Sequence, residues 1–222
     1  MNVLIGDSRA LGIKRSQFSG RLREVEDIWG RGGGKYNTCT KMVERNLIYH
    51  HPPLTNEKTH FYILAGICNL TTLLREGNYE EVIFESENVE KTKNEILALN
   101  SSILNQGSLP VFCTIVTMNL KAWNELRLRQ RKTNTLQFTD NYENMQKELE
   151  SAIMVLNEYI VEINLRNRVA TPLIHTSVYR RKHGKTYALY KNLSDGCHPN
   201  NETYGKMVLS LNRAIAQNSQ LH

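Results

Sequence analysis

Short apolar runs alternate with longer stretches in which hydrophobic residues recur every three or four positions. Such runs, bounded by glycine or polar residues, are typical of buried strands. The pattern predicts strands over residues 2–5, 24–29, 61–65, 110–116 and 173–178. Glycine follows the first run at once and clusters just after the second.

The intervening stretches predict helices over residues 36–49, 79–104 with a break near 87–88, 140–166 and 202–216. The stretch 140–166 has the longest apolar stripe, formed by Tyr142, Met145, Leu149, Ile153, Leu156, Ile160 and Ile163. A stripe of this kind suits either a coiled-coil seam or a helix packed on a sheet. The neighbouring strands favour the second interpretation.

This alternation predicts an α/β protein in which helices cover both faces of a parallel sheet of about five strands. We expect one domain over residues 1–222, with a mobile basic loop around 121–139. Ligands of such sheets bind beyond the carboxyl ends of the strands. Loops that follow the strands are therefore the place to look for chemistry.

Composition narrows the class of protein. The chain has 222 residues, of which 40% are hydrophobic, and no apolar run approaches the ~18 residues that span a bilayer. Its first residues lack the basic and long apolar regions of a signal peptide. Four cysteines without Cys-x-x-Cys pairing argue against structural zinc and favour reduced thiols in the cytoplasm. No metal or cofactor is expected.

The net charge of +6 raises the question of an anionic partner. Positive charge concentrates in residues 127–132 and 180–185. These stretches form either two solvated loops or a patch that contacts nucleic acid or an anionic membrane surface. Composition leaves both interpretations open.

Four short motifs follow one another at expected strand ends or in loops: Gly6-Asp7-Ser8, the glycines 32–34, Gly66-Ile67-Cys68-Asn69, and Asp195-Gly196-Cys197-His198. A serine hydroxyl becomes a useful nucleophile when an imidazole takes its proton and a carboxylate orients that imidazole. The spacing of Asp195 and His198 allows one tight turn to supply both groups.

In this order, the motifs resemble the four blocks of the SGNH (GDSL-type) hydrolase superfamily. The resemblance implies a three-layer, flavodoxin-like fold and hydrolysis of carboxylic esters, such as acyl or acetyl esters of lipid or carbohydrate, through an acyl-enzyme. It assigns Ser8 as nucleophile, His198 as general base and Asp195 as its orienting acid. The oxyanion hole would combine the backbone N–H of Ser8, that of Gly33 and the side-chain amide of Asn69.

The chain departs from the family pattern at two places. A run of three glycines stands where one is usual, so Gly34 is the alternative donor to Gly33. Arg9 replaces the usual leucine, and one interpretation is that it points toward substrate. The glycine run lacks the spacing of a nucleotide-binding P-loop.

A second functional hypothesis is a binding module on the same fold. The superfamily resemblance extends to esterase-like domains of some retroelement open reading frames. In this interpretation the basic stretches contact nucleic acid or an anionic membrane, with little or no catalysis.

Overall fold

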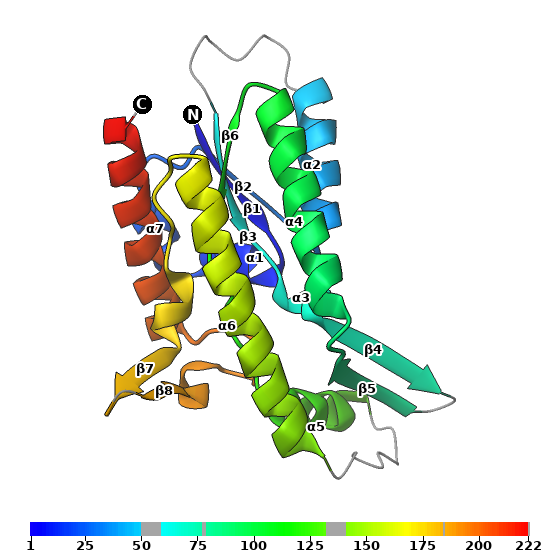
Figure 1. The fold of residues 1–222 in the computed structure, drawn as a ribbon. Coiled ribbons are helices and arrows are strands. Elements are labelled where there is room, and N and C mark those ends of the chain that lie inside the picture. The colour runs from blue at the N-terminus through cyan, green and yellow to red at the C-terminus, as the bar shows by residue number, and fades with distance from the viewer. Residues whose placement is uncertain (50–58, 77–78, 132–140, 184, 222) are drawn as a thin grey trace.

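The computed structural model describes residues 1–49, 59–76, 79–131, 141–183 and 185–221. A central sheet of four parallel strands runs through the molecule in the order β2-β1-β3-β6 (Figure 1). The strands are β1 (Asn2–Gly6), β2 (Asp27–Gly30), β3 (His60–Leu64) and β6 (Leu109–Phe112). The predicted α/β class and parallel sheet are thus confirmed, with four strands.

Helices cover both faces of this sheet. One face packs against α1 (Ser8–Arg15) and α7 (Asn201–Leu221). The other packs against α2 (Tyr36–Tyr49), α4 (Asn88–Asn105) and α6 (Tyr142–Arg166). Because α6 lies on the sheet, its apolar stripe is a core face and not a coiled-coil seam.

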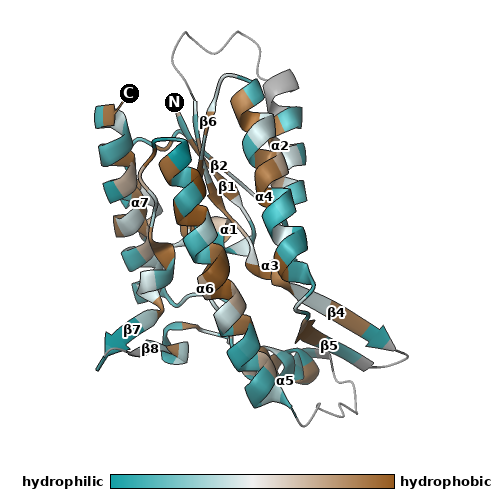
Figure 2. Ribbon diagram, in the orientation of Figure 1, coloured by the Kyte–Doolittle hydropathy of each residue, from teal (hydrophilic) through white to brown (hydrophobic). Residues whose placement is uncertain are grey.

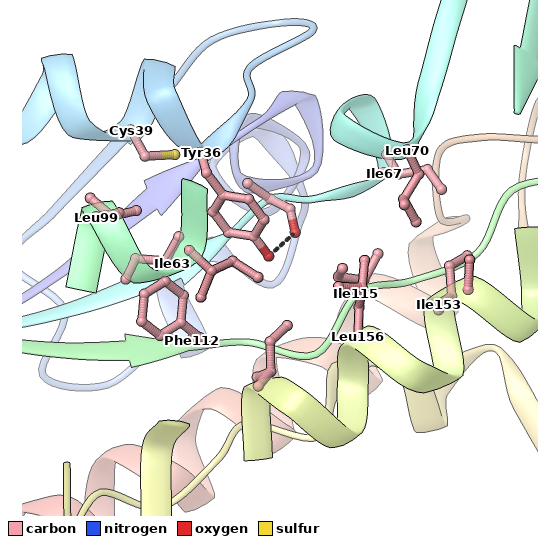
Figure 3. Packing of buried hydrophobic residues seen from close by; sticks show 14 of the residues in the cluster. Tyr36, Cys39, Ile63, Ile67, Leu70, Leu99, Phe112, Ile115, Ile153 and Leu156 are labelled. Carbon is pink, nitrogen blue, oxygen red and sulfur yellow. Dashed lines mark hydrogen bonds between the residues drawn. The ribbon is translucent and has the colours of Figure 1, made fainter. Parts of the chain in front are cut away.

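Alternating side chains of the strands fill two hydrophobic cores. In β1, Val3 and Ile5 enter the core beneath α2, α4 and α6, while Leu4 enters the core beneath α1 and α7. The central strands are largely hydrophobic, as Figure 2 shows. Figure 3 shows how Tyr36 and Phe112 pack within the larger core. Burial on both faces explains why the strands read as continuous apolar runs.

Most of the remaining elements gather toward the carboxyl ends of the strands (Figure 1). They are α3 (Ile67–Leu70), β4 (Thr71–Glu76), β5 (Tyr79–Phe84), α5 (Leu120–Arg131), β7 (Tyr179–Lys182) and β8 (Lys185–Ala188). The chain also forms the 3-10 turns η1 (Ser19–Arg21), η2 (Ile174–Ser177) and η3 (Tyr190–Asn192). β4 pairs with β5 and β7 with β8 as antiparallel hairpins.

Three sequence-based predictions are wrong in detail. The stretch 173–178 contains the 3-10 turn η2 (Ile174–Ser177) and forms no fifth strand of the sheet. Ile174 and Val178 are fully buried beside α7, and their spacing of four suits a helical turn. Residues 79–84 form β5 and not the start of a helix, because the preceding segment pairs with them strand to strand.

The third error concerns the predicted mobile loop at 121–139. Residues up to Arg131 form α5, and residues 132–140 lie outside the described part of the chain. Polar composition suggested a loop, but Asn124 is buried and exchanges hydrogen bonds with the backbone of Val82 in β5. Tertiary contacts therefore stabilise a helix that its low hydrophobicity concealed.

Candidate active site

Ser8 is the first residue of α1, directly after β1. Asp7 caps this helix, since its Oδ1 accepts a hydrogen bond of 2.8 Å from the backbone N–H of Arg9. The first N–H groups of a helix have no acceptor within it, so the N–H of Ser8 is placed to bind an external anion. The turn therefore presents a hydroxyl and a backbone donor together.

Asp195 organises the segment that carries His198. Its Oδ1 accepts the backbone N–H groups of Cys197 at 2.8 Å and His198 at 2.6 Å. Its Oδ2 lies 2.6 Å from Nδ1 of the His198 ring. One carboxylate thus holds both the turn and the imidazole, as the three-residue spacing predicts.

The His198 ring also contacts Ser8, which lies 190 positions away in the chain. Nε2 of His198 is 2.9 Å from Oγ of Ser8. A proton on Nδ1, facing the carboxylate, leaves Nε2 as the acceptor for the serine hydroxyl. Proton transfer from Ser8 to His198 is therefore geometrically possible.

Burial alone would raise the pKa of Asp195, but hydrogen bonds from the His198 side chain and from the backbone N–H groups of His198 and Cys197 lower it below the ordinary value. The carboxyl group is therefore ionised at neutral pH, when it favours the Nδ1–H form of the ring.

Gly34, the last residue of the glycine run, packs on the turn that carries Ser8. A Cβ atom on Gly34 would lie 2.9 Å from the carbonyl oxygen of Arg31 and 3.4 Å from Cα of Asp7, so a larger residue does not fit without a shift. Gly33 has a left-handed φ of 69° and lines the same cavity as Ser8. The structure thus brings both candidate donors close to the serine.

Asn69 lies in α3 and is 5% exposed. Its Oδ1 accepts the backbone N–H of Tyr36 at 3.2 Å, and its Nδ2 donates to Oε2 of Glu95 at 2.7 Å. These contacts fix the amide plane and use one of its two N–H groups. Glu95 comes from α4, and no local motif in the sequence pointed to it.

A cavity of about 540 Å³ opens beside Ser8 and His198. This volume lies within the ~300–1,000 Å³ range of small-molecule sites. The described residues that line it include two cations and no carboxylate. They are Ser8, Gly32, Gly33, Lys35, Ile67, Cys68, Thr71, Thr72, Leu73, Val82, Met118, Trp123, Arg127, Cys197 and His198.

Trp123 also belongs to this site, since it lines the cavity and contacts His198. Its ring meets the His198 ring edge to face, with centroids 5.5 Å apart and planes at 70°. Arg127, one turn along α5, lies over Trp123 and pairs with Glu80 of β5 at 2.8 Å. Because α5 was predicted as a loop, this wall of the cavity could not be anticipated.

Arg9 does not point toward substrate. Its side chain is 2% exposed and donates hydrogen bonds to the backbone carbonyl groups of Cys197 at 3.1 Å and Thr117 at 3.2 Å. The interpretation of this residue as a substrate contact is therefore wrong.

The two cysteines of the cavity wall are free thiols. Burial raises the pKa of Cys68 to about 12 and that of Cys197 to about 11, so neither is a thiolate nucleophile near pH 7. Within the described ranges, no group of three His, Cys, Asp or Glu side chains is arranged to hold a metal ion. Nor does any helix there combine the length and apolar content needed to cross a bilayer.

No protein-family model and no curated protein matches the chain. Solved structures do match it. A GDSL-like lipase from Bacteroides thetaiotaomicron superposes with a TM-score of 0.63 and 15% identity, covering 97% of this chain and 87% of that one. An acetyl xylan esterase superposes with a TM-score of 0.59 and 13% identity, covering 97% of this chain and 100% of that one. The OSK domain of Drosophila Oskar superposes with a TM-score of 0.56 and 12% identity, covering 96% of this chain and 86% of that one.

Across nearly its full length, the chain therefore has the α/β fold of the SGNH (GDSL-type) lipases and acylhydrolases. At these identities the likeness concerns the fold. The chemistry has to be argued from the site itself.

Proposed function

We propose that the protein is a serine hydrolase that cleaves carboxylic esters through an acyl-enzyme. The observation that carries this proposal is the chain of short contacts from Oγ of Ser8 to Nε2 of His198, and from Nδ1 of His198 to Asp195. Nucleophile, base and orienting acid in this connectivity suit acyl transfer. The adjoining cavity gives the ester a place to bind.

In the acylation step, Oγ of Ser8 forms a bond to the ester carbonyl carbon while its proton passes to Nε2 of His198. The resulting imidazolium is stabilised by Asp195, which stays ionised. The tetrahedral intermediate then expels the alcohol oxygen, which takes the proton from Nε2. The product alcohol leaves, and the acyl group remains on Ser8.

Deacylation repeats the sequence with water as the nucleophile. His198 takes one proton from water while the water oxygen attacks the acyl carbon. It returns that proton to Oγ of Ser8 when the bond between Oγ and the acyl carbon breaks. A carboxylic acid is released and the free serine is restored. The cycle needs neither a redox partner nor a metal-bound water.

The negative charge on the carbonyl oxygen requires fixed donors. The backbone N–H of Ser8, that of Gly33 and the second amide N–H of Asn69 are the groups that we assign to this role. Such donors act most strongly when they are held in place before the reaction. The contacts of Asn69 with Tyr36 and Glu95 supply that rigidity.

The cavity favours an ester with an apolar acyl group. Ile67, Leu73, Val82 and Met118 form much of its wall, and Trp123 closes it near His198. A short acyl or acetyl group on lipid or carbohydrate suits these walls. Among the structural relatives are a GDSL-like lipase and an acetyl xylan esterase.

A fluorophosphonate probe tests this proposal. The wild-type protein is expected to form a single covalent adduct, mapped to Ser8 by peptide mass spectrometry, because the activated hydroxyl attacks phosphorus as it would a carbonyl. Denatured protein is the control and should not react. A native protein that gives no adduct, or an adduct on another residue, contradicts the proposal.

Replacing Asn69 with alanine is expected to lower kcat for p-nitrophenyl acetate by roughly 10²–10³-fold, the usual effect of losing one oxyanion donor. KM should change little. Glu95→Gln is the matched variant, since its amide oxygen can still accept from Asn69, and we expect a smaller loss. Equal kcat in Asn69→Ala and wild type would remove Asn69 from the oxyanion hole.

A binding module for anionic surfaces is the second candidate function. Arg180, Arg181 and Lys182 stand exposed on β7. The other basic stretch is a weaker candidate, because Arg127 is half-buried against Glu80 and Arg129 lies 4.0 Å from Glu125. Lys132 lies outside the described residues.

Salt-dependent retention on RNA or on phosphatidylserine vesicles measures this second activity. Removing Arg180 and Arg181 together should reduce the slope of log affinity against log salt by about two, if each contacts one phosphate. Lys41→Ala with Arg45→Ala, two exposed cations of α2, is the matched control. Equal salt slopes for both double variants and wild type would refute a role for β7.

A further inference from the structure

We infer that Arg9 is a positioning residue for the proposed reaction: it tethers the segment that carries Asp195 and His198 to the turn that carries Ser8. The inference rests on the proposed function. Arg9 follows Ser8 directly in α1, and its guanidinium reaches the carbonyl oxygen of Cys197 at 3.1 Å. Nucleophile and base are therefore joined by a second contact besides their own.

Cys197 is held from two sides by groups of the site. Its N–H donates to Asp195, and its carbonyl oxygen accepts from Arg9. Since Cys197 lies between Asp195 and His198 in sequence, fixing its peptide groups fixes the direction in which the imidazole leaves the turn. Among the described residues, the hydrogen bonds that join residues 7–9 to residues 195–198 come from Ser8 and Arg9 alone.

The same guanidinium reaches a third loop, through the carbonyl oxygen of Thr117 at 3.2 Å. Thr117 is fully buried in the segment after β6. The segment next to it also contacts the turn, since the N–H of Asn119 donates to the carbonyl oxygen of Gly196 at 2.7 Å. Arg9 thus joins the loops that follow β1 and β6 to the His198 segment at one buried point.

Burying a cation is costly without compensation, which argues that Arg9 serves a purpose that leucine cannot. Asp7, which is itself 1% exposed, is the acidic side chain that interacts electrostatically with Arg9. Burial raises the pKa of Asp7, and the positive charges of Arg9 and His198 oppose that rise. A leucine at position 9 would remove the positive charge that interacts with Asp7. It would also leave the carbonyl groups of Thr117 and Cys197 without this hydrogen-bond donor.

The test compares Arg9→Leu and Arg9→Lys with wild type. The readouts are kcat and KM for p-nitrophenyl acetate and amide hydrogen exchange of residues 195–198. We expect Arg9→Leu to lower kcat by about 10- to 100-fold at nearly constant KM, since small misplacements of reacting groups have effects of this size. Exchange in that segment should accelerate. Arg9→Lys, which keeps the charge and one donor, should recover part of both losses.

Leu211→Ala is the control for general loss of stability, because Leu211 is buried in the same core of α1 and α7 but lies away from the site. It should lower the melting temperature and leave kcat at 25 °C and exchange of residues 195–198 near wild type. If Arg9→Leu fails to fold, a comparison of kcat and amide exchange between Arg9→Lys and Leu211→Ala decides whether Arg9 positions the segment.

The outcomes separate this inference from the proposed function. If Arg9→Leu has the same kcat and the same amide exchange as the wild type, the inference is overturned. A change in only one of these two readouts also overturns it. A wild-type protein without hydrolysis refutes the proposed function. In that case the exchange comparison still decides whether Arg9 holds the segment in place.

Discussion

Replacing Ser8 with alanine is expected to reduce kcat for p-nitrophenyl acetate by on the order of 10⁴-fold or more, because the acyl-enzyme can no longer form. The fold should survive. Asp7, and not Ser8, caps α1, and the Ser8 side chain faces the cavity. Circular dichroism and the melting temperature check that the variant is folded.

Ser16→Ala is the matched control for this substitution, since Ser16 ends the same helix and its hydroxyl donates to the carbonyl oxygen of Ile13. It should keep wild-type kcat. Turnover by Ser8→Ala at the wild-type rate would exclude Ser8 as the nucleophile. Loss of turnover in both variants would point to damage to α1 instead.

Replacing Asp195 with asparagine is expected to lower kcat by on the order of 10⁴-fold while preserving the size of the side chain. An asparagine NH2 group facing Nδ1 favours the ring tautomer that carries its proton on Nε2. That tautomer cannot accept the proton of Ser8. Asp27→Asn, an exposed aspartate of β2, is the control and should keep wild-type kcat.

The same variant has a pH-dependent effect on stability. The pKa of Asp195 is lower in the folded protein than its ordinary value of 3.8, so its ionised form stabilises the fold above that pH. This contribution disappears as the pH falls through the lower folded value. Urea unfolding should therefore show a stability difference between wild type and Asp195→Asn that is constant near neutral pH and shrinks below about pH 4. A difference independent of pH would contradict the hydrogen-bonded carboxylate.

Residues close together in sequence were the ones whose geometry could be foreseen. Asp195 and His198 share one turn, and Ser8 begins a helix after a buried strand, so short-range patterns sufficed to select them. The β1, β3 and β6 strands were recognisable because burial on both faces makes them continuously apolar. The strand predicted at 173–178 was wrong because the same spacing of apolar residues suits a 3-10 turn that is buried against a single helix.

Side-chain contacts between segments that are distant in the chain could not be predicted from the sequence. Glu95 reaches Asn69 from α4, and Trp123 reaches His198 from a helix that its polar composition disguised. Arg9 illustrates the same limit, since one interpretation of it from the sequence was a substrate contact. Its burial is tolerable because two backbone carbonyl groups accept its hydrogen bonds inside the fold and Asp7 interacts with it electrostatically.

The order of apolar runs and of four short motifs was enough to predict the α/β class and to mark Ser8, Asn69, Asp195 and His198 as candidate site residues. These features depend on local patterns of side chains, which the chain displays directly. Packing alone decided that Ser8 and His198 meet at 2.9 Å, that α5 walls the cavity, and that Arg9 turns inward. Such contacts join residues that lie far apart in the sequence, and their energies exist only once the strands and helices have assembled.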